Sequence, residues 1–141
     1  MPSDHAPRLH HVVFCVRPEN QEPAAQFWRD LGLEFQEIVL VPEGLRVLLD
    51  WSAGIEIISP RVEGGSETER FQQFLDERGE GVCSVVVKAP TVETPIEVAI
   101  RHGSSVRYQQ HREDGGYVLD EADLVPIHGM PVTLLATTRP D

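Results

Sequence analysis

The chain has 141 residues and is 40% hydrophobic, which suits one ordinary domain or two fused small modules. Its 23 acidic side chains outnumber 12 basic ones, and the formal net charge of -11 repels phosphate backbones and anionic membrane surfaces. Nucleic acids and membranes are therefore not expected as partners.

The first half of the chain predicts a strand, a short helix and three further strands. The run LHHVVFCV at 9–16 is rich in β-branched residues, as buried strands are. Pro23 suits the first turn of a helix that carries an apolar stripe and ends at Gly32. Antiparallel strands separated by tight turns are expected at 33–41, 45–51 and 54–59.

A polar, glycine-bearing segment at 61–68 joins the two halves of the chain. It leads into a helix in which Phe71, Phe74 and Leu75 share one face. This segment and its helix are therefore expected to link two modules.

The second half predicts the same order of elements. A strand at 81–88 precedes a helix with Thr94 as N-cap, Pro95 at its first position and Gly103 at its end. Further strands are expected at 104–110, 116–120 and 130–137. The segment 111–116 is expected as a polar hairpin loop and 121–129 as a longer connection.

The order of strand, helix and three strands thus occurs twice, which predicts an α+β fold of two βαβββ modules. The modules span about 9–60 and 81–138, and the linker and helix at 61–80 join them within a single domain of residues 1–141. Two half-barrels of this kind pair into a curved sheet around a cavity, and the chemistry is expected in that cavity.

His11 and Glu56 are the first-module residues best suited to chemistry. Glu56 stands in an isoleucine-rich strand, where a carboxylate is costly unless it is paired, bound to a metal or turned to water. His11 lies within the first strand, and alternation puts His10 on the opposite face, so the two rings do not chelate one ion. A solvent-facing Glu56 and a His11 with only structural hydrogen bonds are the ordinary alternatives.

Four segments resemble motifs of the vicinal oxygen chelate superfamily, which includes glyoxalase I, methylmalonyl-CoA epimerase, extradiol dioxygenases and bleomycin-binding proteins. LHHVVFCV resembles the opening strand of the epimerase-like group, AAQFWRDLGLEF its helix, GIEIISP the strand that closes the first module, and FQQFLDERGEGVCSVVV the segment that opens the second. They occur in the family's order between Leu9 and about Thr137. The resemblance therefore implies the superfamily's fold.

Metal-dependent members of this superfamily hold a divalent cation with ligands from the first and last strands of both modules. Carried over to this chain, the first-module ligands fall on His11 and Glu56, whereas the second-module positions fall on Ser84 and Thr133. Hydroxyls are poor ligands for zinc, iron or cobalt. A divalent metal ion held by His11 and Glu56 and a metal-free acid–base pair therefore both stay open, and no organic cofactor is expected.

Other second-module residues could replace the missing ligands. A shift of one residue would bring Cys83 to the position of Ser84, but it would invert the packing of the whole strand. His111 and His128 are expected in loops, from which either ring could reach the site. No spacing rule supports a ligand from those loops.

The two cysteines and the N-terminal residues bear on the compartment. Cys15 and Cys83 both lie in apolar strands and are expected as reduced, buried thiols. The chain shows neither a signal-peptide pattern nor an apolar run of about 20 residues. We therefore expect a cytoplasmic protein.

The resemblance implies an enzyme of the isomerase, epimerase or lyase type that acts on a small oxygen-rich or acyl substrate. His11 and Glu56 would serve as base and orienting partner in acid–base catalysis. The expected pocket residues are Ser84, Thr133, Trp51, Tyr108 and Tyr117. The alternative is a non-catalytic, metal-free protein that binds a small molecule or confers resistance to one, and a structural partner without a small ligand also stays open. The resemblance also implies a homodimer.

Overall fold

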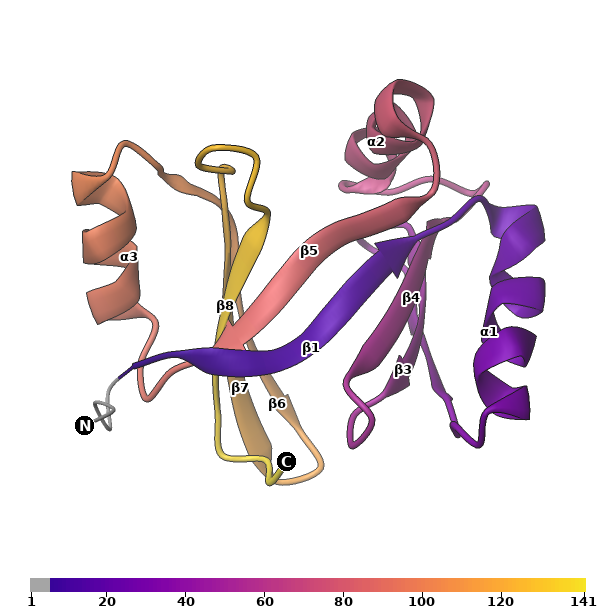
Figure 1. The fold of residues 1–141 in the computed structure, drawn as a ribbon, viewed down its shortest axis with the longest axis horizontal. Helices are drawn as coiled ribbons and strands as arrows, with labels where there is room; N and C mark the ends of the chain where they lie inside the picture. Colours follow the sequence, from indigo (N-terminus) through magenta and orange to yellow (C-terminus); the bar gives the residue numbers. More distant parts are fainter. Residues whose placement is uncertain (1–5) are drawn as a thin grey trace. The chain divides into compact units, whose positions relative to one another are not determined.

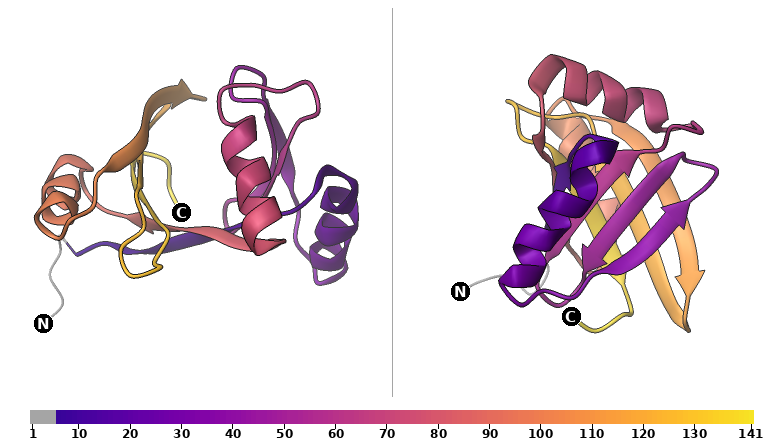
Figure 2. Two further views of the ribbon diagram at one scale, coloured as in Figure 1. Left: turned by 90° about the horizontal axis from the view of Figure 1, so that it is seen from above. Right: turned by 90° about the vertical axis from the view of Figure 1, so that its right-hand side faces the viewer.

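The computed structural model describes residues 6–141 (Figures 1 and 2), and the chain in it divides into two compact units. The first unit consists of residues 11–83. The second unit consists of residues 84–141 together with the chain before residue 11, of which residues 6–10 are described. The strands β1 (Arg8–Cys15) and β5 (Gly81–Lys88) each run from one unit into the other.

The first unit contains β1 from residue 11 onward, one short 3-10 turn, two helices and three further strands. These elements are η1 (Pro18–Asn20), α1 (Gln21–Asp30), β2 (Gln36–Leu40), β3 (Leu45–Asp50), β4 (Ile55–Pro60) and α2 (Thr68–Arg78). The strand order is β2-β3-β4-β1, with β1 parallel to β4 and the other pairs antiparallel. This is the first module that the sequence predicts.

The core of the first unit lies between α1 and one face of β3 and β4, along which α1 runs (Figures 1 and 2). Ala25, Leu48 and Ile57 are almost completely buried there. Burying a leucine or isoleucine side chain contributes about 1.5–3 kcal/mol. Pro23 lies in the first turn of α1, and Gly32 follows its end with a φ of 106°, as the sequence predicts.

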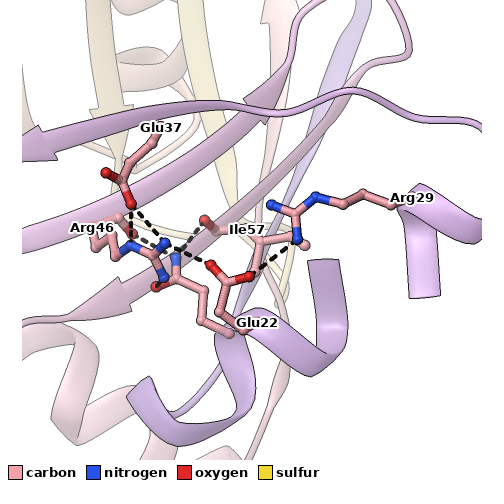
Figure 3. A network of polar contacts seen from close by, with 6 residues as sticks. Glu22, Arg29, Glu37, Arg46 and Ile57 are labelled. Atoms are coloured by element: carbon pink, nitrogen blue, oxygen red, sulfur yellow. Dashed lines mark hydrogen bonds and ion pairs between the residues drawn. The ribbon is translucent and has the colours of Figure 1, made fainter. Parts of the chain in front are cut away.

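Charged side chains fasten α1 to the edge of these strands (Figure 3). The Arg46 guanidinium of β3 lies between two carboxylates, donating to Glu22 Oε1 at 2.7 Å and to Glu37 Oε2 at 2.7 Å. Glu22 also accepts a hydrogen bond from Arg29 at 3.1 Å. The hydrogen bond from Arg46 and then that from Arg29 lower the pKa of Glu22. The network therefore favours an ionised carboxylate at the start of α1.

Gly44, in the turn between β2 and β3, lies against the segment that follows β4. A Cβ atom on Gly44 would collide with the backbone of Gly65 and with Thr68 Oγ1, and its φ is 72°. The Thr68 hydroxyl donates to the Gly44 carbonyl at 2.9 Å. Only a residue without a side chain fits this approach of two backbones, so the turn fixes where α2 begins.

The second unit has residues of β5 from 84 onward, one helix and three further strands. These elements are α3 (Glu93–Arg101), β6 (Val106–Asp114), β7 (Tyr117–Leu124) and β8 (Val132–Thr137). The strand order is β6-β7-β8-β5, with β5 parallel to β8 and the other pairs antiparallel. Its core lies between α3 and one face of the strands and is formed by Val92, Ala99, Ala122, Leu124 and Leu134.

The two units repeat one pattern in strand order and in register. In the first unit Val13 of β1 lies opposite Glu56 of β4, and in the second unit Val86 of β5 lies opposite Thr133 of β8. His11 precedes Val13 by two residues, as Ser84 precedes Val86. The α+β fold class with two βαβββ modules is therefore confirmed.

Three details of the second unit differ from the prediction. β6 continues to Asp114 and β7 to Leu124, so the hairpin turn is short and part of the expected connection 121–129 is strand. The segment at 111–114 was predicted as loop because it is polar on both faces, yet its backbone pairs with β7. α3 begins at Glu93, with Val92 rather than Thr94 at the N-cap.

Candidate functional site

His11 and Glu56 lie on the same face of the first unit. Glu56 of β4 is opposite Val13, and His11 is two residues away along β1, so the two side chains project to one side of the pair. His11 Nε2 is 3.4 Å from Glu56 Oε1. The side chain of His11 is 6% exposed and that of Glu56 is 18% exposed. The structure thus brings together the two residues that the sequence singles out, and leaves the carboxylate the more accessible.

Trp51 lies beside His11 in the first unit. The two ring centroids are 6.2 Å apart, and the rings are tilted by 42°. Trp51 directly follows β3, whose Leu49 lies opposite Glu56. An indole next to an imidazole and a carboxylate keeps water away and strengthens the interaction between the two groups.

Both cysteines lie in the first unit, and their side chains contact each other. Cys15 is fully buried on β1, and Cys83 is partly buried on β5. The hydrogen bond between the two thiols, then burial and the nearby Glu56 carboxylate, raise the pKa of Cys83 well above its usual value. The Cys83 thiol is therefore protonated and weakly nucleophilic at neutral pH.

Ser84 and Thr133 lie together in the second unit. Ser84 Oγ and Thr133 Oγ1 are 2.6 Å apart, and the two residues are 9% and 8% exposed. Thr133 Oγ1 donates to Asp123 Oδ1 at 3.0 Å, and Arg107 Nε donates to Asp123 Oδ2 at 2.9 Å. We call Ser84, Thr133, Asp123 and Arg107 the hydroxyl chain. Ser84, and not Cys83, lies beside Thr133. The one-residue shift that would bring Cys83 to this position therefore does not occur.

Asp123 is a polar residue of this face that the sequence analysis missed. It lies on β7, in the stretch that was predicted as a connection. A break in register between Val106 and Tyr108 places Tyr108 opposite Asp123 and leaves Arg107 as the extra residue of a β-bulge. The alternation of buried Ala122 and Leu124 with polar neighbours was the signal that could have revealed this strand.

The remaining predicted residues, His111, His128, Tyr117 and Tyr108, all belong to the second unit. His111 is an exposed residue of β6, not of a loop, and its Nδ1 lies 2.6 Å from Asp120 Oδ1. The interaction with Asp120 raises the pKa of His111. His128 is exposed in the loop before β8, and Tyr117 is 39% exposed at the start of β7. Tyr108 is partly buried.

The donor atoms do not match a tight site for a transition metal. His11 and Glu56 supply an imidazole and a carboxylate, but Ser84 and Thr133 supply hydroxyls that are engaged with each other. Over residues 6–141 no three of the histidine, cysteine, aspartate and glutamate side chains come together so that they could hold a metal ion. We therefore derive no chemical step through a metal.

The second unit also contains an apolar pocket of about 400 Å³, on the face of its strands that α3 covers. Val87, Val132 and Leu134 form its floor, alternating along their strands with Val86 and Thr133. Val98 and His102 of the α3 region line its side. No charged side chain is among the described lining residues. A volume of this size suits a small apolar molecule.

Comparison with known proteins finds similarity in structure. A Streptomyces coelicolor methylmalonyl-CoA epimerase variant in complex with 2-nitronate-propionyl-CoA is similar at a TM-score of 0.69 and 21% identity, over 94% of this chain and 98% of that chain. The methylmalonyl-CoA epimerase from Mycobacterium tuberculosis has a TM-score of 0.68 and 19% identity, over 96% and 91% of the two chains. A mutant of 4-hydroxymandelate synthase from Streptomyces coelicolor has a TM-score of 0.71 and 15% identity, over 96% of this chain and 50% of that chain.

No protein-family model matches the sequence, and no curated protein matches it significantly. The structural similarities show that the chain has the α+β fold of vicinal oxygen chelate proteins, as its motifs predict. The fold hosts several chemistries, so the function must be argued from the residues. Among the described residues, no helix combines the length and the apolar character needed to cross a membrane.

Proposed function

We propose that this chain is a small-molecule enzyme of the vicinal oxygen chelate fold in which Glu56 and His11 carry out acid–base chemistry. The observation that carries the proposal is the placement of a largely buried imidazole 3.4 Å from a more accessible carboxylate, beside an indole ring. Pairs of titratable groups in partly desolvated surroundings are typical of catalytic acids and bases.

The exposure of the two side chains suggests how the roles divide. Glu56 is 18% exposed and His11 is 6% exposed, so a substrate reaches the carboxylate more easily than the ring. Glu56 is the proposed base, which takes a proton from the substrate and returns it. His11 holds the carboxylate in place through Nε2 and is the proposed positioning residue.

The substrate class follows from what a carboxylate base can do. It can remove a proton from carbon where the resulting negative charge is delocalised into a neighbouring carbonyl group. Epimerisation and isomerisation next to a carbonyl both need that step. The similarity to epimerases, one of which is in complex with methylmalonyl-CoA, supports this reaction class for the chain.

Exchange of a substrate proton with solvent deuterium tests the proposal without knowledge of the product. We would incubate the protein in deuterium oxide with a panel of acyl thioesters and 2-oxo acids, methylmalonyl-CoA among them, and follow the proton next to the carbonyl by NMR. Glu56→Gln should lower the exchange rate about 10²-fold to 10⁴-fold because an amide cannot accept the proton. His11→Gln should lower it less, by about tenfold to a hundredfold.

Glu113→Gln is the matched control because Glu113 is exposed at the end of β6 and the variant makes the same change of group. It should leave the exchange rate within about twofold of the wild type. Equal rates for Glu56→Gln and the wild type, with a substrate that the wild type turns over, would exclude Glu56 as the base. Dialysis against a chelator should leave the rate unchanged, and a loss that zinc or cobalt restores would instead show a metal enzyme.

A second candidate function is the binding of a small apolar molecule without catalysis. The observation that favours it is the apolar pocket of about 400 Å³ in the second unit. In that case Val98→Asp should weaken the binding of an apolar fluorescent probe at least tenfold, because it places a charge at the partly exposed side of an apolar pocket. Glu56→Ala and His11→Ala should then leave the affinity within about tenfold of the wild type.

A further inference from the structure

Three basic side chains of the second unit surround one carboxylate. Lys88 Nζ lies 2.9 Å and His10 Nε2 lies 3.3 Å from Oδ1 of Asp141. Arg8 contacts the other oxygen, Oδ2, through a terminal nitrogen of its guanidinium. Both oxygens of the carboxylate are therefore engaged, and by cationic or potentially cationic groups. None of these residues belongs to the proposed active-site pair.

Basic groups are in the minority in this chain. The chain has 12 lysines and arginines against 23 acidic residues, yet two of those basic residues and a histidine meet at one carboxylate. Positive charges this close repel one another unless an anion lies between them. The arrangement therefore has the chemistry of an anion site, and Asp141 supplies the anion.

The three basic groups lie on strands, whereas the carboxylate between them follows the last strand of the second unit. Arg8 and His10 lie on β1 and Lys88 lies on β5. The His10 side chain is only 4% exposed. Asp141 follows β8, which ends at Thr137, and its side chain is 43% exposed. Lys88 is 22% exposed and Arg8 is 63% exposed, so His10 and Lys88 are the more enclosed of the three basic groups.

We propose that Arg8, His10 and Lys88 form a binding site for a small carboxylate, and that the side chain of Asp141 occupies this site as a competitor. The class of ligand follows from the contacts, because donors approach both oxygens of a carboxylate from different strands. An attached group competes at an effective concentration in the millimolar range. A free carboxylate therefore binds the intact chain weakly and binds better once Asp141 is removed.

The experiment compares the binding of malonate to the full chain and to Asp141→Ala. The NMR signal of the His10 ring reports on the site because His10 Nε2 lies next to the carboxylate. Asp141→Ala should bind malonate at least tenfold more tightly than the wild type does. Adding Arg8→Ala or Lys88→Ala to Asp141→Ala should weaken that binding at least tenfold.

Two controls separate the site from a general effect of charge or folding. Asp114→Ala removes the same charge from the exposed end of β6 and should bind malonate as the wild type does. Asp141→Asn keeps the shape of the side chain and should also bind malonate more tightly than the wild type. A structural disturbance in Asp141→Ala would therefore not be mistaken for an open site.

Several results would overturn the proposal. Equal malonate binding by the wild type, Asp141→Ala and Asp141→Asn would show that Asp141 does not compete. Tighter binding of inorganic phosphate than of malonate to Asp141→Ala would show that carboxylates are not the ligand class. All of these experiments measure binding at His10. Their outcome therefore tests the carboxylate site separately from the deuterium exchange that tests Glu56 and His11.

Discussion

The first and second units place different chemistry on equivalent strands. In the first unit, parallel strands β1 and β4 present an imidazole and a carboxylate 3.4 Å apart. In the second unit, parallel strands β5 and β8 present two hydroxyls 2.6 Å apart, at the same offset in register. Backbone pairing thus fixes where the two side chains meet, while residue type decides whether the pair can exchange protons.

The largest expected effect is a difference in catalysis between the two pairs. Glu56→Gln should lower kcat/KM about 10²-fold to 10⁴-fold, because it removes the proposed base. Thr133→Val changes the equivalent strand position of the second unit and should lower kcat/KM by about tenfold or less. Steady-state kinetics on a substrate found by deuterium exchange checks the order. A larger loss for Thr133→Val would assign the chemistry to the second unit.

The hairpin turns of the two units should differ in their tolerance of a side chain. Gly44→Ala in the first unit should lower the free energy of unfolding by about 3 kcal/mol, because its Cβ would meet the backbone of Gly65 at a positive φ. Gly116 in the second unit has a φ of 85°, but no atom lies within 4 Å of the Cβ that an alanine would add. Gly116→Ala should therefore lower the free energy of unfolding by only about 1 kcal/mol. Urea unfolding measures both losses. Equal losses would show that backbone strain alone decides.

The hydroxyl chain should behave as a coupled unit. Thr133→Val removes one hydrogen bond from the Ser84 hydroxyl and one from the Asp123 carboxylate. This should lower the free energy of unfolding by about 1–3 kcal/mol. In a double-mutant cycle, Ser84→Ala and Thr133→Val should show a coupling of about 1 kcal/mol. Losses that simply add would mean that the hydroxyls contribute independently of each other.

The smallest expected effect concerns the ion pairs of α1 in acid. Because the pKa of Glu22 is lowered in the folded state, its contribution is complete above the unfolded-state pKa and is lost as the pH falls through the folded-state value. Between about pH 7 and about pH 3, the wild type should therefore lose more stability than Glu22→Gln. Glu22 is 57% exposed, so solvent screening limits the difference to about 0.5 kcal/mol.

A rise in salt sharpens this last comparison. Salt screens exposed ion pairs, so the difference between the wild type and Glu22→Gln should shrink at about 0.5 M sodium chloride. The Ser84–Thr133 coupling joins buried neutral hydroxyls and should not change with salt. A coupling that falls with salt would show that the charge of Asp123 dominates the hydroxyl chain.

The sequence predicts the strands that have a regular apolar pattern and misses those that do not. β1, β4 and β5 carry long apolar runs, and the predicted limits agree closely with the observed ones. The end of β6 carries polar residues on both faces, so hydrophobic periodicity gives no signal there, and the end of β7 adds only a short alternation of polar residues with Ala122 and Leu124. Their limits are set by pairing across the turn at Gly115 and Gly116, which is tertiary information.

The candidate site shows the same division. His11 and Glu56 stand out because each is a polar residue in an apolar strand, and the repeat pattern relates them to Ser84 and Thr133. Asp123 carries no such signal because it lies among other acidic residues, and Arg107 carries none because it stands in a mixed polar stretch. Only the register of β7 and the bulge at Arg107 bring them to the hydroxyls. Long-range pairing of this kind cannot be read from one sequence.

The rate at which the thiols of the first unit are labelled measures how often that unit opens. Cys15 is fully buried, and the raised pKa of Cys83 keeps its sulfur protonated, so neither reacts readily with alkylating reagents while the unit stays closed. Each labelling of Cys15 therefore records an excursion in which β1 has come away from its surroundings. The natural sequence already carries this reporter, and following its labelling over time requires no engineered probe.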